Sequence, residues 1–225
     1  MIEALTVSVN YADYLRETLP TWLPFVDRVL VLTNRQDEAT CRVVEEHCGK
    51  VAWLHSNSLA MSGPFDRGIA INQGLAALDR TGWVLLIDAD IGLVRPIPPF
   101  RDKRVLYGAM RLDVIGRDQW RAALAGERLG LPSRDDRRDA AFTPKERSRL
   151  VRGYFQLFYH KNARRHVGPL YPEGHPNVSG ADWAFARQFG RLRCRFPREL
   201  FVACHLSMPG DREGANWDGR TTPAW

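Results

Sequence analysis

The sequence predicts an α/β fold in which a mostly parallel, twisted sheet carries helices on both faces. Short apolar runs typical of buried strands alternate with segments whose apolar residues recur at helical spacing through the first half of the chain. Several of these runs end at polar residues, and the carboxyl ends of parallel strands are where such sheets bind ligands. A hydrophobic content of 44% over 225 residues is enough for one folded core.

The first half of the chain contains most of the regular pattern. Strands are predicted at 4–9, 26–33, 51–55 and 83–87, and helices around 14–22, 38–48 and 65–78. Asp37 directly precedes the second helix and is a good N-cap residue. Because each strand leads through a helix to the next strand, the pattern favours parallel pairing.

The second half is less regular. Strands are predicted at Val105–Met110, at the aromatic run Gly153–His160 and at Leu200–Leu206, with a helix at Ala181–Phe189. The segment from Ile115 to Ser148 is polar, rich in arginine and only weakly periodic, so no element is predicted there.

The strand at 83–87 runs directly into Asp88-Ala89-Asp90. Residues i and i+2 of a strand point to the same side, so the two carboxylates are expected to converge on one divalent cation. Aspartates that only end a strand before a loop would give the same short pattern. The surrounding residues therefore have to distinguish the two interpretations.

Positive charge is concentrated in one part of the chain. The formal net charge is +6, and 13 Lys and Arg stand against 6 Asp and Glu between Arg117 and Arg165. A local basic surface of this kind suits phosphates or another polyanion, although a solvated arginine-rich face is also common.

Composition also bears on the cellular compartment. The four cysteines form no Cys-x-x-Cys pair, which favours reduced thiols, and no apolar run approaches the length of a membrane span. The N-terminal residues lack the pattern of a secretory signal. We therefore expect a cytoplasmic protein with no membrane span.

Several motifs together resemble glycosyltransferases of the GT-A (Rossmann-like) fold. They are Thr6-Val7-Ser8-Val9-Asn10-Tyr11, Thr33-Asn34, Phe65-Asp66-Arg67-Gly68, Ala70-Ile71-Asn72 and Asp88-Ala89-Asp90. The resemblance implies metal-dependent transfer of a sugar from a nucleotide-sugar, with a UDP-sugar as the expected donor. It further implies a single domain, with a nucleotide-sugar-binding half at 1–92 and an acceptor-binding half with a C-terminal tail at 93–225.

A closer resemblance is to small phage-encoded enzymes that add sugars to hydroxymethylated bases in DNA. It depends on the strand from Trp83 to Ile91, on Gly180-Ala181-Asp182, and on His205 followed by Asn216-Trp217-x-Gly219-Arg220. This resemblance implies a hydroxymethylated pyrimidine in DNA as acceptor, held by the basic segment from Arg117 to Arg165. It also implies the host cell cytoplasm as the location.

The resemblance assigns roles to individual residues. Mn²⁺ or Mg²⁺ would be held by Asp90 and His205, with Asp88 contacting the ribose or the metal through water. Asp182 would be the general base if the reaction inverts configuration. The donor-contacting residues would be Asn10, Asn34, Asp37, Arg67, Asn72, Asp88, Asn216, Trp217 and Arg220.

Each assignment has a structural alternative. Asn34 and Asp37 are residues that commonly close turns, and Asp182 or Ser179 would serve as a helix cap. Further alternatives are a surface charge at Arg67, a structural histidine at His205 and hydrophobic packing of Trp217.

Other functions fit the sequence less well. A haloacid-dehalogenase-type phosphatase carries its Asp-x-Asp on the first strand, and a nucleotidyltransferase would be expected to show a glycine-rich phosphate loop there. A non-catalytic DNA-binding module explains the basic segment, but it does not explain the paired carboxylates. Among glycosyltransferases, a polysaccharide or lipopolysaccharide acceptor is the alternative to DNA.

Overall fold

The structure of the protein is a computed structural model of the whole chain. It describes residues 1–60, 65–79, 81–127, 141, 143–160, 170–174 and 178–207, with only the backbone described at 178 and 179.

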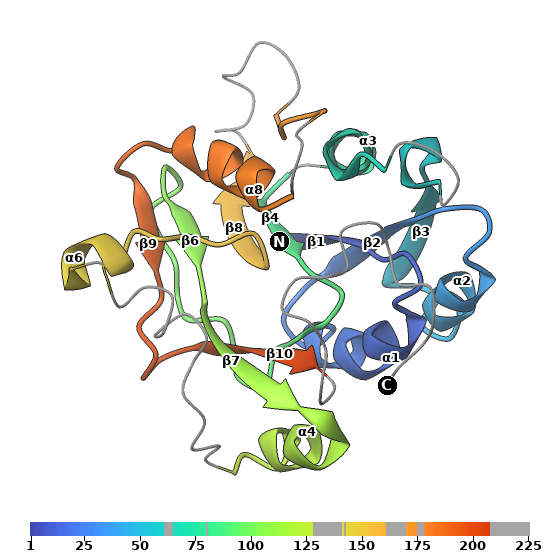
Figure 1. Cartoon of the computed structure of the whole chain (residues 1–225), viewed down its shortest axis with the longest axis horizontal. Coiled ribbons are helices and arrows are strands. Elements are labelled where there is room, and N and C mark those ends of the chain that lie inside the picture. Colours follow the sequence, from blue (N-terminus) through green and yellow to red (C-terminus); the bar gives the residue numbers. More distant parts are fainter. Residues whose placement is uncertain are drawn as a thin grey trace.

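A seven-stranded sheet forms the centre of the molecule (Figure 1). Its spatial order is β3-β2-β1-β4-β8-β6-β9. The strands are β1 (Ile2–Val7), β2 (Arg28–Thr33), β3 (Val51–His55), β4 (Trp83–Ile87), β6 (Leu106–Gly108), β8 (Phe155–Tyr159) and β9 (Arg193–Arg195). Strands β1 to β4 pair in parallel, whereas β8 is antiparallel to both of its neighbours, β4 and β6. The predicted mostly parallel α/β sheet is confirmed.

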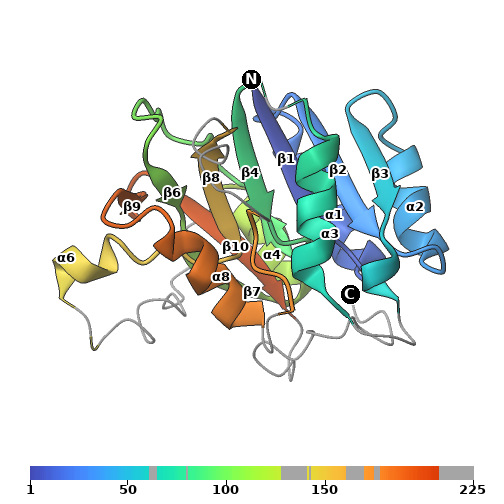
Figure 2. The same ribbon diagram turned by 90° about the horizontal axis from the view of Figure 1, so that it is seen from above.

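Helices cover both faces of this sheet, because neighbouring residues of a strand point to opposite sides. Ala4 packs in one core with α1 (Ala12–Trp22) and α2 (Glu38–Glu45). Its neighbour Leu5 packs in the other core with α3 (Arg67–Ala77) and α8 (Val178–Arg187). Figure 2 shows α3 and α8 on one side of the sheet and α1 on the other.

A second, three-stranded sheet lies beside the first and was not predicted. Its order is β5-β10-β7, formed by Ile91–Gly92, Val202–Ser207 and Met110–Ile115. The strand predicted at Val105–Met110 is therefore divided at Ala109, where the chain leaves the large sheet and β7 begins to pair with β10. Helix α4 (Gly116–Leu124) covers one face of the small sheet, with Trp120 and Ala123 buried against it.

Helix boundaries also differ from the sequence prediction. The weakly periodic segment contains α4 and the short α6 (Pro144–Arg147), which begins with a capping box between Thr143 and Glu146. Helix α8 begins at Val178 instead of Ala181, and a 3₁₀ turn, η1, occupies Asn57–Leu59. Helix α4 is short, and tertiary packing of its buried residues supports it. Helix α6 has no buried residue and is stabilised locally by its capping box.

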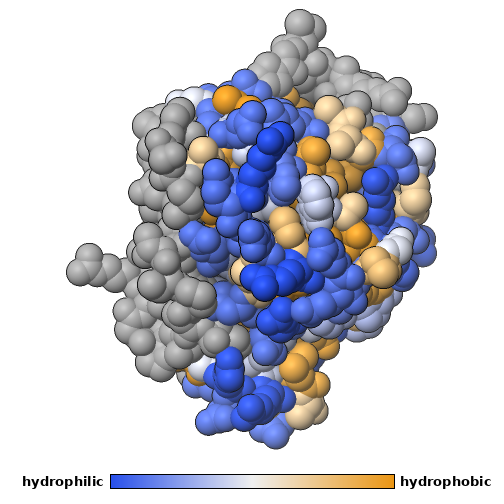
Figure 3. All heavy atoms as spheres, turned by 90° about the vertical axis from the view of Figure 1, so that its right-hand side faces the viewer, coloured by the Kyte–Doolittle hydropathy of each residue, from blue (hydrophilic) through white to orange (hydrophobic). Residues whose placement is uncertain are grey.

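At one end of the large sheet lies the edge strand β3. Figure 3 shows that hydrophilic residues cover most of the face at this end of the molecule, around a smaller hydrophobic area. Trp53 of β3 is 40% exposed and stacks on His55. In the part of the chain that the structure describes, no helix is long and apolar enough to cross a membrane.

Candidate active site

The turn after β4 carries Asp88 and Asp90 to the carboxyl edge of the parallel strands. Neighbouring elements hold its backbone by hydrogen bonds on both sides. These are Asp88 N to Tyr154 O (3.2 Å), Thr18 Oγ1 to Ala89 O (2.7 Å), Leu206 N to Asp90 O (2.8 Å) and Trp22 Nε1 to Ile91 O (2.6 Å). With helix α1, strand β10 and Tyr154 all bonded to it, the turn is fixed in place.

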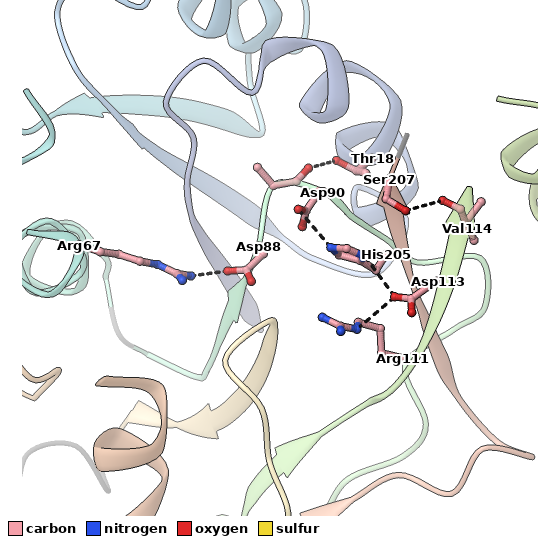
Figure 4. Close-up of polar contacts among 10 residues, drawn as sticks. Thr18, Arg67, Asp88, Asp90, Arg111, Asp113, Val114, His205 and Ser207 are labelled. Atoms are coloured by element: carbon pink, nitrogen blue, oxygen red, sulfur yellow. Dashed lines mark hydrogen bonds and ion pairs between the residues drawn. The ribbon is translucent and has the colours of Figure 1, made fainter. Parts of the chain in front are cut away.

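Asp90 meets His205, which is far away in the sequence. His205 Nε2 on β10 lies 3.5 Å from Asp90 Oδ2, and both side chains are more than four-fifths buried (Figure 4). The other oxygen of Asp90, Oδ1, is buried and has no hydrogen-bond partner among the described residues. Burial opposes the charge on Asp90, but His205 and Arg111 outweigh it and lower the pKa of the carboxyl.

Two further residues complete this group, and the sequence analysis did not find them. Asp113 Oδ1 lies 3.2 Å from His205 Nδ1, and Arg111 Nε lies 3.5 Å from the same oxygen of Asp113. His205 and Asp113 are cross-strand partners in the β10–β7 pairing. The available signal was the alternation Arg111-Leu112-Asp113-Val114, which extends a strand beyond Met110. We call Asp90, His205, Asp113 and Arg111 the metal-side cluster.

Asp88 points to a different partner. Its Oδ1 forms an ion pair with Arg67 Nη2 from the start of α3 (Figure 4). Burial opposes the charge of the Arg67 guanidinium, but Asp88 and Asp182 outweigh it and raise its pKa. Asp88 lies just after the strand and Asp90 lies in the following turn, so strand geometry does not relate them. The two aspartates accordingly contact different partners.

Asp182 is a half-buried carboxylate in the middle of α8. Because the helix begins at Val178, Asp182 lies in its second turn, and the capping interpretation is wrong. Its Oδ1 accepts a hydrogen bond from the Tyr171 hydroxyl, and its carboxylate fills the space where a side chain of Gly153 would stand. Burial raises the pKa of Asp182 to about 6, with Asp88 acting in the same direction and Arg67 and Tyr171 against it. We call Arg67, Asp88, Tyr171 and Asp182 the base-side cluster.

Helix α3 holds the segment that carries Tyr171. The Asn72 amide donates to Tyr171 O and accepts from Tyr171 N, both at 2.8 Å. Asp66 caps α3 at Ile69 N and also accepts from Gly174 N at 2.6 Å. The structure therefore places Asn72 against the protein's own backbone, where its amide positions Tyr171 instead of facing a donor.

Asn34 and Asp37 also use their polar atoms within the protein. Asn34 Oδ1 accepts from Gln36 N and Asp37 N at 3.0 and 2.9 Å, and its amide donates to Leu59 O. Asp37 caps α2 at Thr40 N and accepts from Asn10 N at 2.8 Å. Asn34 and Asp37 are buried, so the structure supports the turn-closing alternative for both.

Asn10 adopts a left-handed backbone conformation with φ of 57°, which brings its N–H onto Asp37. It is half-buried at the end of the first strand's loop. The remaining predicted donor contacts, Asn216, Trp217 and Arg220, lie outside the described residues, as do positions 128–140, 142 and 161–165 of the basic segment.

The metal-side cluster fits a divalent cation in its donor chemistry. Two atoms that share one cation at about 2.1 to 2.2 Å lie about 3.0 to 3.6 Å apart, and the Asp90–His205 contact falls within this range. The buried Asp90 Oδ1 without a partner would be a further donor atom for such a cation. Among the described residues no group of three or more His, Cys, Asp or Glu side chains is arranged around one point. Protein ligands would thus be few, as is usual where substrate phosphate and water complete the shell.

Comparison of the sequence with known proteins gives no assignment, because no family model and no curated protein matches it. The fold does match solved structures. Glucosyl-3-phosphoglycerate synthase from Mycobacterium tuberculosis, in complex with Mn²⁺, UDP-glucose and phosphoglyceric acid, aligns with a TM-score of 0.55 at 15% identity. The match covers 93% of this chain and 73% of that chain.

Two further matches are of the same quality. The same enzyme in complex with Mg²⁺ and UDP gives a TM-score of 0.54 at 15% identity, covering 93% of this chain and 72% of that one. A structure described only as a mycobacterial protein gives 0.53 at 16% identity, covering 93% and 68%. At this level of identity the matches concern the fold. The chain therefore has an α/β, GT-A-like fold with a mostly parallel mixed sheet.

Proposed function

We propose that this protein is a metal-dependent glycosyltransferase that takes a sugar from a nucleotide-sugar, with a UDP-sugar as the first donor to test. The observation that supports this most directly is the pair formed by Asp90 and His205 at the carboxyl edge of β4. This edge is where α/β sheets bind ligands, and the pair offers ligand atoms suited to Mn²⁺ or Mg²⁺. The similar enzyme from Mycobacterium tuberculosis was solved with Mn²⁺ and UDP-glucose.

The chemistry divides between the two clusters. In the transfer, an acceptor hydroxyl oxygen forms a bond to the anomeric carbon while the bond from that carbon to the diphosphate oxygen breaks. A divalent cation at Asp90 and His205 would supply Lewis-acid stabilisation of the charge on the departing nucleotide. Asp182, whose pKa of about 6 allows it to be ionised at neutral pH, would accept the acceptor's proton in an inverting reaction.

Asn10, Asp88 and Arg67 remain candidates for the donor side. Arg67 and Asp88 form one ion pair, so a ribose or phosphate reaching this position would meet both charges at once. Asn216, Trp217 and Arg220 are proposed to contact the donor phosphates, on the basis of the sequence resemblance alone.

For the acceptor we propose a polyanion, with a hydroxymethylated pyrimidine in DNA first. The support is a group of arginines around α8, the helix that carries Asp182. Arg152 and Arg187 lie over the Trp183 ring at 5.4 and 6.0 Å from its centre. Burial, followed by repulsion from Arg187 and Arg149, lowers the pKa of Arg193. Cations gathered in this way attract phosphates.

The donor and metal are tested together. The protein is incubated with candidate UDP-sugars and Mn²⁺, and nucleotide release is followed with and without a chelator. Nucleotide release that is lost in chelator and regained with Mn²⁺ supports the proposal. If UDP-sugars neither bind nor react in the presence of either metal, the proposed function is wrong.

The acceptor needs a separate assay. DNA containing hydroxymethylcytosine is incubated with the reactive donor, and the nucleosides are weighed by mass spectrometry for a hexose gain. Sugar transfer to a polysaccharide or lipopolysaccharide, with no mass gain on DNA, would show that the acceptor is a glycan and that the DNA proposal is wrong. DNA binding without any sugar transfer would favour the non-catalytic DNA-binding module.

The arginines around α8 allow a sharper version of this assay. Replacing Arg149 and Arg187 together with Ala removes two charges, and the salt-dependence slope of DNA binding should fall by about 0.9 for each phosphate that is no longer neutralised. Replacing Arg16 and Arg42, which lie on α1 and α2, changes the net charge equally and should leave the slope unchanged. Equal effects from both pairs would show that net charge alone, and no acceptor surface at α8, governs binding.

A further inference from the structure

We propose that Asp113 is a positioning residue that fixes the orientation and tautomer of His205 for metal binding. The inference rests on the proposed function, because it assigns a role within the same metal site. It concerns a residue to which the sequence analysis gave no role.

The register of the small sheet brings the two residues together. In the parallel pairing of β10 with β7, His205 is opposite Asp113 and Ala203 is opposite Arg111. Since side chains alternate along a strand, Arg111, Asp113 and His205 share one face. The other face carries the apolar residues Val114, Cys204 and Leu206, which pack against Trp120. The polar face is therefore held in register by a packed hydrophobic face.

The two ring nitrogens of His205 face different carboxylates. Nδ1 lies 3.2 Å from Asp113 Oδ1, and Nε2 lies 3.5 Å from Asp90 Oδ2 (Figure 4). A neutral imidazole can bind a metal through only one nitrogen while the other carries a proton. A proton on Nδ1 facing Asp113 leaves the lone pair of Nε2 directed to the Asp90 side. Carboxylates commonly fix metal-binding histidines in this way.

Arg111 supports the carboxylate in turn. Its Nε lies 3.5 Å from Asp113 Oδ1, and its guanidinium lies over the Tyr154 ring at 5.0 Å. Arg111 and the Asp113 side chain are both mostly buried, and their ion pair restrains the carboxylate beside His205. A series of contacts thus connects the small sheet to the proposed metal position, from Arg111 through Asp113 and His205 to Asp90.

A purely structural role makes a different prediction. If Asp113 only pairs with charged neighbours to stabilise the sheet, its removal should lower thermal stability without a specific effect on metal binding. The affinity for Mn²⁺ distinguishes the two roles, because a ligand-orienting carboxylate typically contributes about 10- to 100-fold in metal affinity.

The test measures Mn²⁺ binding to the full chain in the presence of UDP, by electron paramagnetic resonance of free Mn²⁺, together with thermal melting without metal. Asp113→Ala should weaken Mn²⁺ binding about 10- to 100-fold. Asp113→Asn, which keeps the volume and one acceptor oxygen, should fold like the wild type and show a smaller loss. The matched control is Asp118→Asn, which breaks an exposed ion pair with Arg121 in the same half of the chain and should change neither quantity.

The outcomes separate this inference from the proposed function. A wild-type protein that binds Mn²⁺ with UDP, together with folded Asp113 variants of unchanged affinity, overturns the role of Asp113 and leaves the proposed function intact. A wild-type protein that binds no Mn²⁺ overturns both. A double variant that loses no more affinity than His205→Gln alone shows that Asp113 acts through His205.

Discussion

The metal-side and base-side clusters are built from similar residues but use them differently. Each contains two aspartates and one arginine, and each includes one aspartate of the turn after β4. In the base-side cluster, both Asp88 and Asp182 have a direct partner, in Arg67 and Tyr171. In the metal-side cluster, a buried oxygen of Asp90 has no hydrogen-bond partner among the described residues. Among the described residues the base-side cluster leaves one buried donor without a partner, Arg67 Nε, whereas Asp90 Oδ1 in the metal-side cluster is an acceptor that a cation could use.

The largest effect should come from removing Asp90. Asp90→Ala deletes the ligand atoms nearest to His205, so we expect loss of Mn²⁺ binding and a fall in kcat/KM on the order of 10³-fold. Mn²⁺ titration and a donor-turnover assay measure the two effects, with far-UV circular dichroism as the folding control. Full activity of this variant in chelator would show that the metal-side cluster, like the base-side cluster, needs no cation.

Asp182 should affect turnover nearly as strongly, but without changing metal affinity. Asp182→Asn removes the proposed base and should lower kcat about 10²- to 10⁴-fold if the reaction inverts configuration. Because the pKa of Asp182 is about 6, activity of the wild type should rise with pH through that value as the carboxylate forms. A small change in kcat would instead favour a retaining reaction, which needs no single base.

The same substitution has an opposite effect on stability. The pKa of Asp182 in the folded protein exceeds its usual 3.8, so the folded state binds this proton more tightly than the unfolded chain does. The free energy of unfolding should therefore fall as pH rises from about 4 to 6. At neutral pH Asp182→Asn should be more stable than the wild type by on the order of 1 to 3 kcal/mol, measured by denaturant unfolding.

Arg67 should also contribute to stability, through its ion pair with Asp88. Arg67→Met leaves Asp88 without its partner, and because the Asp88 side chain is 30% exposed we expect a loss of about 1 to 3 kcal/mol, less than for a fully buried pair. Arg28→Met breaks the exposed Arg28–Asp79 pair and serves as control, with an expected loss below about 1 kcal/mol. Equal losses in the two variants would show that the Arg67–Asp88 pair contributes no more to stability than an exposed ion pair does.

The smallest effect is expected from the Tyr171 hydroxyl. Its hydrogen bond favours the charged form of Asp182, so Tyr171→Phe should raise the pKa of Asp182 and move the acidic limb of the pH–activity profile upward. The stability loss should be about 1 kcal/mol. Tyr107→Phe removes a hydroxyl bonded to Asp102 N, away from Asp182, and should leave the profile in place.

The sequence by itself determined the class of fold. Alternating apolar runs predicted β1 to β4 and the three helices between them, because each of these elements shows its own periodicity over enough residues. It also predicted Asp90, His205 and Asp182 as site residues, through motifs that resemble a known family. The roles of these residues stay predictions. The structure shows Asp90 beside His205, and Asp182 close to Arg67, the partner of Asp88.

Only the tertiary structure decided which side chains meet. Asn34, Asp37 and Asn72 have polar atoms that suit a ligand, and the sequence cannot show that backbone groups distant in the chain already occupy them. The division of the strand at Ala109 likewise depends on pairing with β10, which lies near the end of the described chain. Asp113 reaches His205 for the same reason. The periodicity of a segment indicates its own secondary structure, whereas the packing of the whole fold sets the contacts between elements.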